Sequence, residues 1–139
     1  MRLVVDTNII IAALIRDSVC RKILLSPRFE FITIGLTRFE IEAHKPELLE
    51  KARISEEEFS KIFSLLFSKL FIITDGVIKS KMSTAITIMD NIDPDDTPFI
   101  ALALAVQNDG IWSDDKHFQD QNKVRVFTTR ELISILNSD

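Results

Sequence analysis

Short apolar runs alternate with longer amphipathic segments along this 139-residue chain, and that alternation limits the folds open to it. Runs rich in β-branched and aromatic residues predict strands. We expect them at residues 2–5, 29–34, 71–74, 111–113 and 124–127. Strands separated by helices favour a mainly parallel sheet of four to five strands sandwiched between helices on both faces. The sequence therefore predicts the α/β class.

The segments between these runs have helical periodicity. Helices are predicted over residues 8–14, 18–25, 37–49, 55–70 and 77–89, then from Thr97 to Gly110 and from Thr128 to Leu136. Three of them open on a capping-box pattern: Thr37 with Glu40, Ser55 with Glu58, and Thr128 with Glu131. The run FIALALAV after Pro98 is apolar on nearly every face, so its helix is expected at the centre of the fold.

Bulk properties indicate an ordinary globular protein. The apolar content of 46% argues against disorder, and the length predicts one domain over residues 1–139. The first apolar run is too short for a signal peptide, and no run approaches a membrane span. The single Cys20 cannot form an internal disulfide. We therefore expect a cytoplasmic protein that does not enter a membrane.

Charge and glycine content exclude several classes of function. The net charge of −4 is not that of a general nucleic-acid binder, which is usually basic, although it permits an acidic metal site. Three glycines cannot build a phosphate loop or a dinucleotide fingerprint. Neither histidine lies beside a convincing nucleophile, which argues against covalent catalysis.

Carboxylates stand where several of the apolar runs end. Asp6 follows the first predicted strand, Asp114 and Asp115 follow the fourth, Glu40 opens a helix, and Asp93, Asp95 and Asp96 precede the central helix. In an open parallel sheet, ligands bind beyond the carboxyl ends of the strands, so these groups can meet there. Like charges repel unless a cation lies between them, and oxygen ligands suit Mg²⁺ or Mn²⁺. The pattern predicts a metal-dependent enzyme that cleaves phosphodiesters.

Four of these segments together resemble the PIN domain, a family of metal-dependent ribonucleases. The triplet DTN at residues 6–8 matches the family's opening motif, and Glu40 within FEIEAH matches its helix-borne glutamate. Asp96 in DDTPFIALALA matches the aspartate before the central helix. The segment IWSDDKHF resembles the fourth motif, in which Asp115 is the matching aspartate. The resemblance covers essentially the whole chain.

The resemblance implies a doubly wound three-layer sandwich, one or two Mg²⁺ or Mn²⁺ ions, and cleavage of RNA. Many relatives are toxins of toxin–antitoxin pairs and form homodimers, so a homodimer and an antitoxin partner are expected. The implied catalytic and metal-binding residues are Asp6, Glu40, Asp96 and Asp115. Because acids are doubled in two motifs, Asp114 and Asp93 are further candidate ligands. Asn8 and Ser113 are expected to support the ligands.

Structural roles compete with these assignments. Asp6, Asn8 and Asp96 could each simply cap a helix, and Glu40 is part of a predicted capping box. Glu42 is expected to face away from the site, and His44 could touch substrate. Residues that could contact phosphate are His117, Lys116, Arg16, Arg38 and Lys45.

Three other functions fit parts of the pattern. The first is a scaffold of the same fold that binds RNA or a partner with little or no nuclease activity; four filled acidic positions count against it. The second is a phosphatase of the haloacid dehalogenase type, which needs an aspartate where Asn8 stands. The third is a response-regulator receiver, which needs an early acidic pair that this chain lacks.

Overall fold

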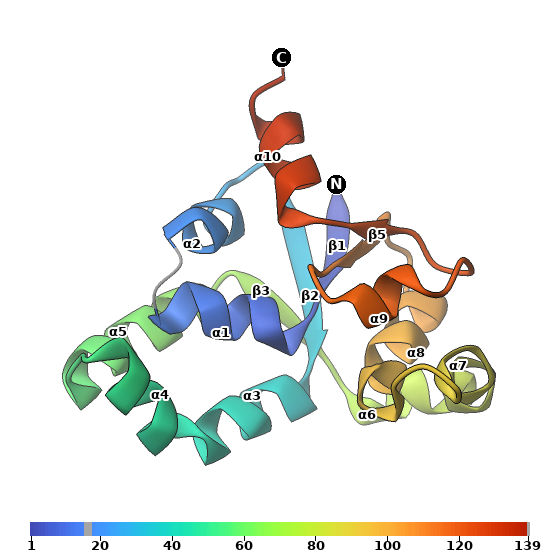
Figure 1. Ribbon diagram of the computed structural model, residues 1–139, viewed down its shortest axis with the longest axis horizontal. Helices are drawn as coiled ribbons and strands as arrows, with labels where there is room; N and C mark the ends of the chain where they lie inside the picture. Colours follow the sequence, from blue (N-terminus) through green and yellow to red (C-terminus); the bar gives the residue numbers. More distant parts are fainter. Residues whose placement is uncertain (16–17, 139) are drawn as a thin grey trace.

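A five-stranded parallel sheet forms the middle of the protein. The computed structural model describes residues 1–15 and 18–138 (Figure 1). The strands are β1 (Arg2–Val5), β2 (Glu30–Ile34), β3 (Leu70–Ile73), β4 (Gly110–Trp112) and β5 (Val126–Phe127). Their order across the sheet is β3-β2-β1-β4-β5, and every neighbouring pair is parallel. The predicted α/β class and parallel sheet are therefore confirmed.

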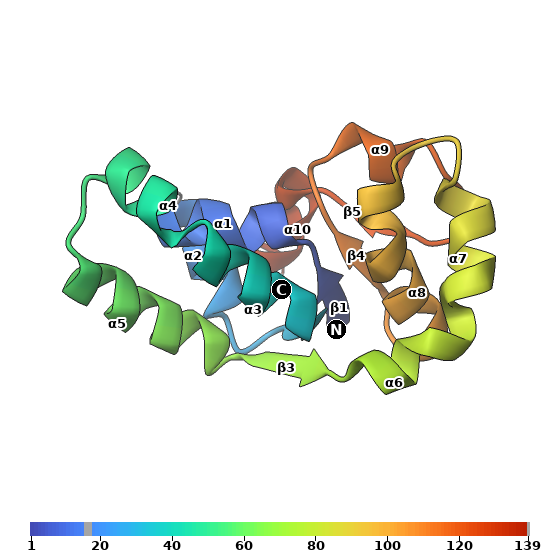
Figure 2. The ribbon, with the colours of Figure 1, turned by 90° about the horizontal axis from the view of Figure 1, so that it is seen from below.

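Helices cover both faces of the sheet, as Figure 2 shows. One face carries α1 (Thr7–Ile15), α2 (Ser18–Leu24), α3 (Gly35–Ala43), α4 (Lys45–Ala52), α5 (Glu56–Phe67) and α10 (Thr129–Leu136). The other carries α6 (Asp75–Ile78), α7 (Met82–Met89), α8 (Thr97–Ala105) and α9 (Lys116–Gln119). Short 3₁₀ turns, η1 (Lys79–Lys81) and η2 (Pro94–Asp96), precede α7 and α8. The result is a three-layer sandwich.

The alternation of side chains along each strand divides the core in two. In β1, Leu3 and Val5 belong to the core under α1 and α2, whereas Val4 belongs to the core under α8. All three are fully buried. Burial on both faces explains why β1 is a continuous apolar run and not an alternating one. As predicted, α8 lies against the middle of the sheet, with Phe99 to Leu102 buried.

The order of the strands fixes where a ligand site can form. From β1 the chain moves outward to β2 and β3 with helices on one face, then returns on the other face to add β4 and β5 beside β1. Right-handed crossovers require this change of face when the direction reverses. The crevice at such a reversal, beyond the carboxyl ends of β1 and β4, is the ordinary ligand site of an open α/β sheet.

Several predicted helix boundaries are wrong. The helix expected over 37–49 is two helices that meet at His44, because Pro46 starts a new helix at the first turn of α4. The segment 77–89 is likewise divided into α6, η1 and α7. Helix α8 ends at Ala105, not at Gly110. Gly110 begins β4 with φ of 147°, where a Cβ would lie 2.7 Å from the Arg125 carbonyl oxygen.

The capping predictions have mixed outcomes. Thr128 and Glu131 form the full capping box, and Ser55 accepts the backbone N–H of Glu58. The box expected for Thr37 is wrong. Helix α3 starts two residues earlier, directly from β2, so Thr37 lies inside the helix with its hydroxyl buried.

Membrane insertion can be tested on helix length and polarity. Within the described part of the chain, no helix is both long and apolar enough to cross a bilayer.

Candidate metal centre

An acidic pocket of about 480 Å³ opens at the carboxyl ends of β1 and β4. Its acidic lining residues are Asp6, Glu40, Asp93, Asp95, Asp96 and Asp115. The four carboxylates that the sequence analysis places in one site therefore line one pocket. They come from a strand end, two helix starts and the middle of α3, so only the tertiary fold brings them together.

Asp6 lies at the bottom of this pocket and is 3% exposed. Its Oδ2 accepts a hydrogen bond of 2.5 Å from the hydroxyl of Ser113, 107 positions away in the chain. Its Oδ1 accepts the backbone N–H of Asn8 at 2.7 Å, which also caps the first turn of α1. Burial raises the pKa of Asp6, although the bonds from Ser113 and Asn8 oppose that rise. Asp6 therefore both caps α1 and lines the pocket.

Ser113 connects Asp6 to the fourth motif. Residues Val5 and Trp112 are paired across β1 and β4, so the next residue on each strand meets its counterpart. While the Ser113 hydroxyl donates to Asp6, its oxygen accepts the backbone N–H of Asp115 at 3.0 Å. Ser113 thereby fixes the carboxylate of Asp6 and the backbone from which the Asp115 side chain extends. Asn8 contributes through its backbone, and its exposed side chain lines the pocket.

Asp96 is the least satisfied of the carboxylates. It occupies the N-cap position of α8, yet its side chain makes no capping hydrogen bond. Its Oδ2 is buried and has no hydrogen-bond partner. Burial, followed by the charges of Asp115, Asp93 and Asp6, raises the pKa of Asp96 to about 7. A buried oxygen without a donor costs about 1–3 kcal/mol, so this group calls for a proton or a cation.

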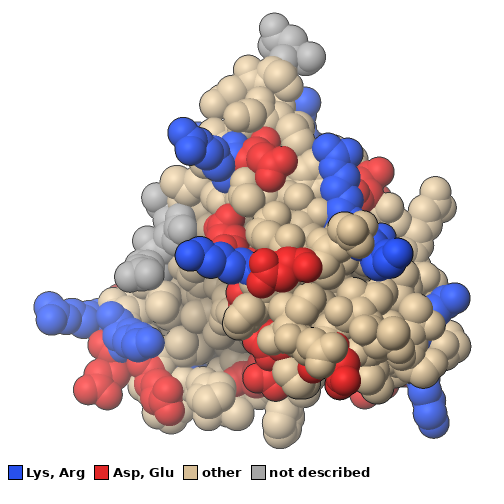
Figure 3. All heavy atoms as spheres, turned by 45° about the vertical axis from the view of Figure 1, so that its right-hand side comes forward, with Lys and Arg blue, Asp and Glu red and all other residues tan. Residues whose placement is uncertain are grey.

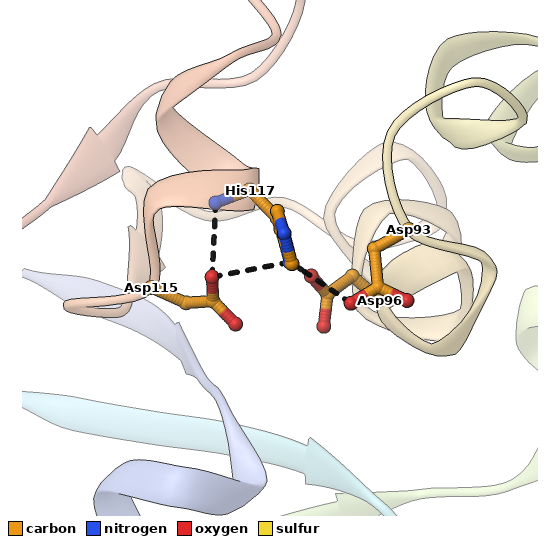
Figure 4. Close-up of side chains that lie close together, drawn as sticks. All are labelled: Asp93, Asp96, Asp115 and His117. Carbon is orange, nitrogen blue, oxygen red and sulfur yellow. Dashed lines mark hydrogen bonds and ion pairs between the residues drawn. The ribbon is translucent and has the colours of Figure 1, made fainter.

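Asp93, Asp96, Asp115 and His117 lie together at the side of the pocket (Figure 4). One ligand atom from each lies within 4.8 Å of all the others. His117 Nδ1 is 2.9 Å from Asp93 Oδ2, 3.4 Å from Asp115 Oδ1 and 3.9 Å from Asp96 Oδ2. Asp115 also caps α9, because its Oδ1 accepts the backbone N–H of His117 at 2.9 Å.

Glu40 lines the pocket from α3. Burial, followed by the charge of Asp95, raises its pKa. The helix is fixed to β1 and β2 by buried hydroxyls: Thr37 Oγ1 lies 2.9 Å from Thr7 Oγ1 and 3.1 Å from Thr33 Oγ1. Thr33 in turn donates to the carbonyl of Val5. These contacts hold the helix that carries Glu40 against the strand that carries Asp6.

Asp114 takes a different place from its neighbour and does not line the pocket. Its Oδ1 accepts the backbone N–H of Thr129 at 2.8 Å, and its Oδ2 accepts the Thr129 hydroxyl at 2.5 Å. These bonds join the end of β4 to the start of α10. Successive residues in an extended chain point in opposite directions, which explains why only one of the pair reaches the pocket.

No lysine or arginine of residues 1–15 and 18–138 lines this pocket. Figure 3 shows acidic side chains gathered at the lower centre of one face of the protein. Two of the predicted phosphate contacts are engaged elsewhere: Lys45 pairs with Glu56 at 2.8 Å, and Arg38 lies over the Phe63 ring. Arg16 lies outside the described residues. Among the described residues, the lining of the pocket therefore carries acidic side chains and no lysine or arginine to balance them.

Two further predicted residues also lie outside the pocket. Glu42 is exposed on α3 and pairs with Arg38 at 3.4 Å, as its place on the helix predicts. His44 ends α3, where its Nδ1 lies 3.8 Å from Glu47 Oε1.

Comparison with protein families agrees with this geometry. A family model of the PIN domain matches residues 4–135, nearly the full length of the chain. The chain belongs to the PIN domain family. No curated protein matches the chain closely. PIN domains are in general metal-dependent nucleases, and this PIN domain has an acidic cluster suited to a divalent metal.

The donor set fits a hard divalent cation. Three carboxylates and one imidazole offer ligand atoms close together, and Mg²⁺ and Mn²⁺ favour oxygen ligands of this kind. The buried, unpartnered Oδ2 of Asp96 points to the same conclusion, because a cation would satisfy it. The side chains of this PIN domain therefore fit the metal that its family uses.

Sequence reasoning missed the place of His117 within this group. It treated His117 only as one of several phosphate contacts. The position of His117, two residues after Asp115, could have indicated this contact. The carboxylate of an N-cap aspartate accepts the backbone N–H of the residue two positions later, which brings that residue close to it.

Proposed function

We propose that this protein is a Mg²⁺- or Mn²⁺-dependent endoribonuclease that hydrolyses RNA at the acidic pocket. The observation that supports it most is Asp96 Oδ2, which is buried among other carboxylates without a hydrogen-bond donor. A structural aspartate at this position would cap α8, and Asp96 does not. An uncompensated carboxylate is kept in a fold at a cost in stability, which is typical of functional sites.

Asp96, Asp115 and Asp93 are the proposed metal ligands, with Asp6 as a further ligand. Both oxygens of Asp6 already accept a hydrogen bond, but an ionised carboxylate has about four lone-pair sites and can accept more. A bound divalent ion would supply Lewis acidity, which lowers the pKa of a water and stabilises charge on a phosphate. His117 can act as a further ligand or, when protonated, pair with Asp93.

Glu40 is the proposed general base. It lines the same pocket as Asp93, Asp96 and Asp115, from a helix of its own, and is not part of their close group. Its raised pKa brings the carboxylate nearer to working pH, where a general base is most effective. In this role Glu40 Oε accepts a proton from the attacking water, while Ser113 keeps Asp6 and Asp115 in place.

The alternative, a PIN-fold scaffold that binds RNA or a partner without cleaving it, is less well supported. A scaffold has no need to keep six acidic side chains around one pocket. The phosphatase and receiver alternatives do not agree with the PIN match over residues 4–135.

The cellular role we propose is that of a cytoplasmic toxin in a toxin–antitoxin pair, acting as a homodimer. Large exposed apolar side chains support a protein partner: Phe39 is 69% exposed, and Phe71 is 56% exposed on the edge strand β3. Sedimentation of the purified protein at micromolar concentration tests the dimer, and a monomer there would reject it. Co-expression with the product of a neighbouring gene tests the antitoxin.

The nuclease proposal can be tested on the isolated protein. RNA of mixed structure is incubated with Mn²⁺, with Mg²⁺ and with EDTA, using the parent protein, Asp96→Asn and Asp114→Asn. We expect metal-dependent cleavage by the parent and by Asp114→Asn, and none by Asp96→Asn. Mn²⁺ should also raise the melting temperature of the parent but not of Asp96→Asn. Equal cleavage by parent and Asp96→Asn would reject the proposal, as would no cleavage under any condition.

A further inference from the structure

A second groove, of about 500 Å³, lies directly beside the acidic pocket. Leu36 and Pro98 line both, so the two adjoin at the carboxyl end of the sheet. The groove lies between the starts of α3 and α8 on one side and α6 with η1 on the other. Its size is within the usual range for small-ligand sites.

The lining of this groove is mostly apolar, whereas that of the acidic pocket is mostly polar. The floor and walls of the groove include Ile34, Ile78 and Met82. Two charged side chains, Asp75 and Lys79, are part of the lining. An apolar cavity with a few polar groups is the general form of a site for a flat organic ring, such as a nucleobase.

Lys79 and Asp75 offset each other in the lining, so the groove lacks the net negative charge of the acidic pocket and offers one ammonium group. The side chain of Lys79 is exposed, and it forms no ion pair with any carboxylate of the described residues. Lys45, in contrast, already pairs with Glu56. An ammonium group next to an apolar groove suits an anion attached to an apolar ring, and a nucleotide combines the two.

We propose that this groove binds one unpaired nucleobase of the RNA strand, next to the phosphodiester in the acidic pocket, and that Lys79 contacts a neighbouring phosphate. The proposal rests on the proposed nuclease function. The position beside the acidic pocket and the unpaired ammonium of Lys79 favour RNA over an apolar protein segment, which would bring no anion to Lys79. The substrate is then single-stranded at the cleavage site, because a paired and stacked base cannot enter a groove.

Gly76 allows the groove to be filled without disturbing the core. It lines the groove, and a Cβ built on it meets nothing within 4 Å. Gly76→Phe should therefore place a ring at the groove where the base would lie. Ser80→Phe is the matched control, because Ser80 is exposed in the adjoining η1 turn and does not line the groove.

The experiment is a double-mutant cycle in which one change is made in the protein and the other in the RNA. Single-stranded RNA oligomers with one known cleavage site are prepared with an abasic residue at each position around it. For the parent and Ser80→Phe, one flanking abasic position should raise KM about tenfold, in line with the loss of one stacked base. Gly76→Phe should raise KM by a similar factor on the intact oligomer. For this variant, the abasic residue at that position should raise KM no further. The kcat at saturating RNA should change less than twofold, because the acidic pocket is untouched.

Lys79 is tested by salt dependence. The logarithm of kcat/KM is plotted against that of KCl concentration for the parent, Lys79→Ala and the neighbouring control Lys81→Ala. The slope should fall by about 0.7 for Lys79→Ala, the value for one phosphate contact on a single strand, and stay unchanged for Lys81→Ala.

The outcomes separate the two proposals. If the parent cleaves no RNA, the nuclease function is rejected and the groove assignment with it. If the parent cleaves RNA while Gly76→Phe and Lys79→Ala behave as their controls, the nuclease stands and the nucleobase site is rejected. If Gly76→Phe changes only sedimentation and not KM, the groove binds a protein segment, and the nucleobase site is again rejected.

Discussion

The acidic pocket and the start of α10 use the same residue type for opposite purposes. At α10, both oxygens of Asp114 accept hydrogen bonds from Thr129, and Glu131 completes a capping box with Thr128. In the pocket, Asp96 is more deeply buried, yet its Oδ2 has no donor. An aspartate whose oxygens are all satisfied stabilises the fold. A buried oxygen without a donor can instead be satisfied by a cation, and this difference separates Asp114 from Asp96.

The largest effect should come from Asp96→Asn. The amide keeps the size of the side chain but cannot bind a divalent ion as a carboxylate does. We expect kcat/KM for RNA to fall by about a thousandfold, since metal-based charge stabilisation contributes several kcal/mol. Asp114→Asn should cleave within threefold of the parent. A comparable loss in both variants would mean that the pocket and the cap do not differ in the way proposed.

The pH dependence of stability should follow the pocket as well. In metal-free protein the pKa of Asp96 is raised from 3.8 to about 7, so the folded state binds its proton more tightly than the unfolded state. Stability from this group is therefore full below pH 4 and is lost as pH rises toward 7. The full shift corresponds to about 4 kcal/mol, and screening by solvent at this partly open pocket reduces the expected loss to about 2 kcal/mol. Urea unfolding in EDTA from pH 4.5 to 8 measures it.

Asp96→Asn is the control for this measurement, and it should flatten the curve and be the more stable protein at pH 8. Stability of the parent that rises with pH in the same window would contradict the assignment. Because protons compete with the metal at Asp96, the Mn²⁺ concentration needed for half-maximal activity should fall between pH 6 and 8.

Asp114→Ala should lower stability and leave cleavage activity unchanged, the reverse of what is expected for Asp96→Asn. Removing the carboxylate leaves the backbone N–H of Thr129 without its partner and loosens the start of α10. Loss of such a cap costs about 1–2 kcal/mol, seen as a lower urea midpoint with an unchanged slope. Metal-dependent cleavage below the melting temperature should stay near that of the parent. An unchanged midpoint would show that the Asp114 bonds contribute nothing to stability.

The smallest effect should come from Thr37→Val, which tests how Glu40 is positioned. Valine fills the same space but removes the hydroxyl between Thr7 and Thr33. We expect a loss of stability of about 1 kcal/mol, the usual contribution of a buried hydrogen bond. Since Glu40 lies one turn further along α3, kcat should fall more than KM rises. Thr37→Ser, which keeps the hydroxyl, should restore kcat but not the full stability; equal kcat in both would remove Thr37 from any positioning role.

Much of the fold follows from local signals in the chain. Residues 3–5 of β1 are all apolar because this part of the strand is buried on both faces, and Pro98 with the apolar residues after it predicts the central helix α8. Boundaries that depend on tertiary packing were not predictable. Pattern alone placed a cap at Thr37, whereas packing against Thr7 and Thr33 draws that residue into the helix and buries it. Likewise, the role of Gly110 at the start of β4 depends on how closely the Arg125 backbone and the Phe127 ring approach.

The sequence by itself determined which residue types follow which strands. It therefore predicted that carboxylates would meet at one end of the sheet. It could not decide how each of them is satisfied, because a hydrogen-bond donor to a side chain comes from wherever the chain folds back. In the tertiary structure, Asp114 accepts a hydrogen bond from Thr129 and Asp6 accepts one from Ser113. Asp93 lies against His117, whereas Asp96 Oδ2 has no donor. Desolvation, which depends on the whole surrounding fold, makes that missing bond costly, and this is why we propose Asp96 as a ligand for a cation.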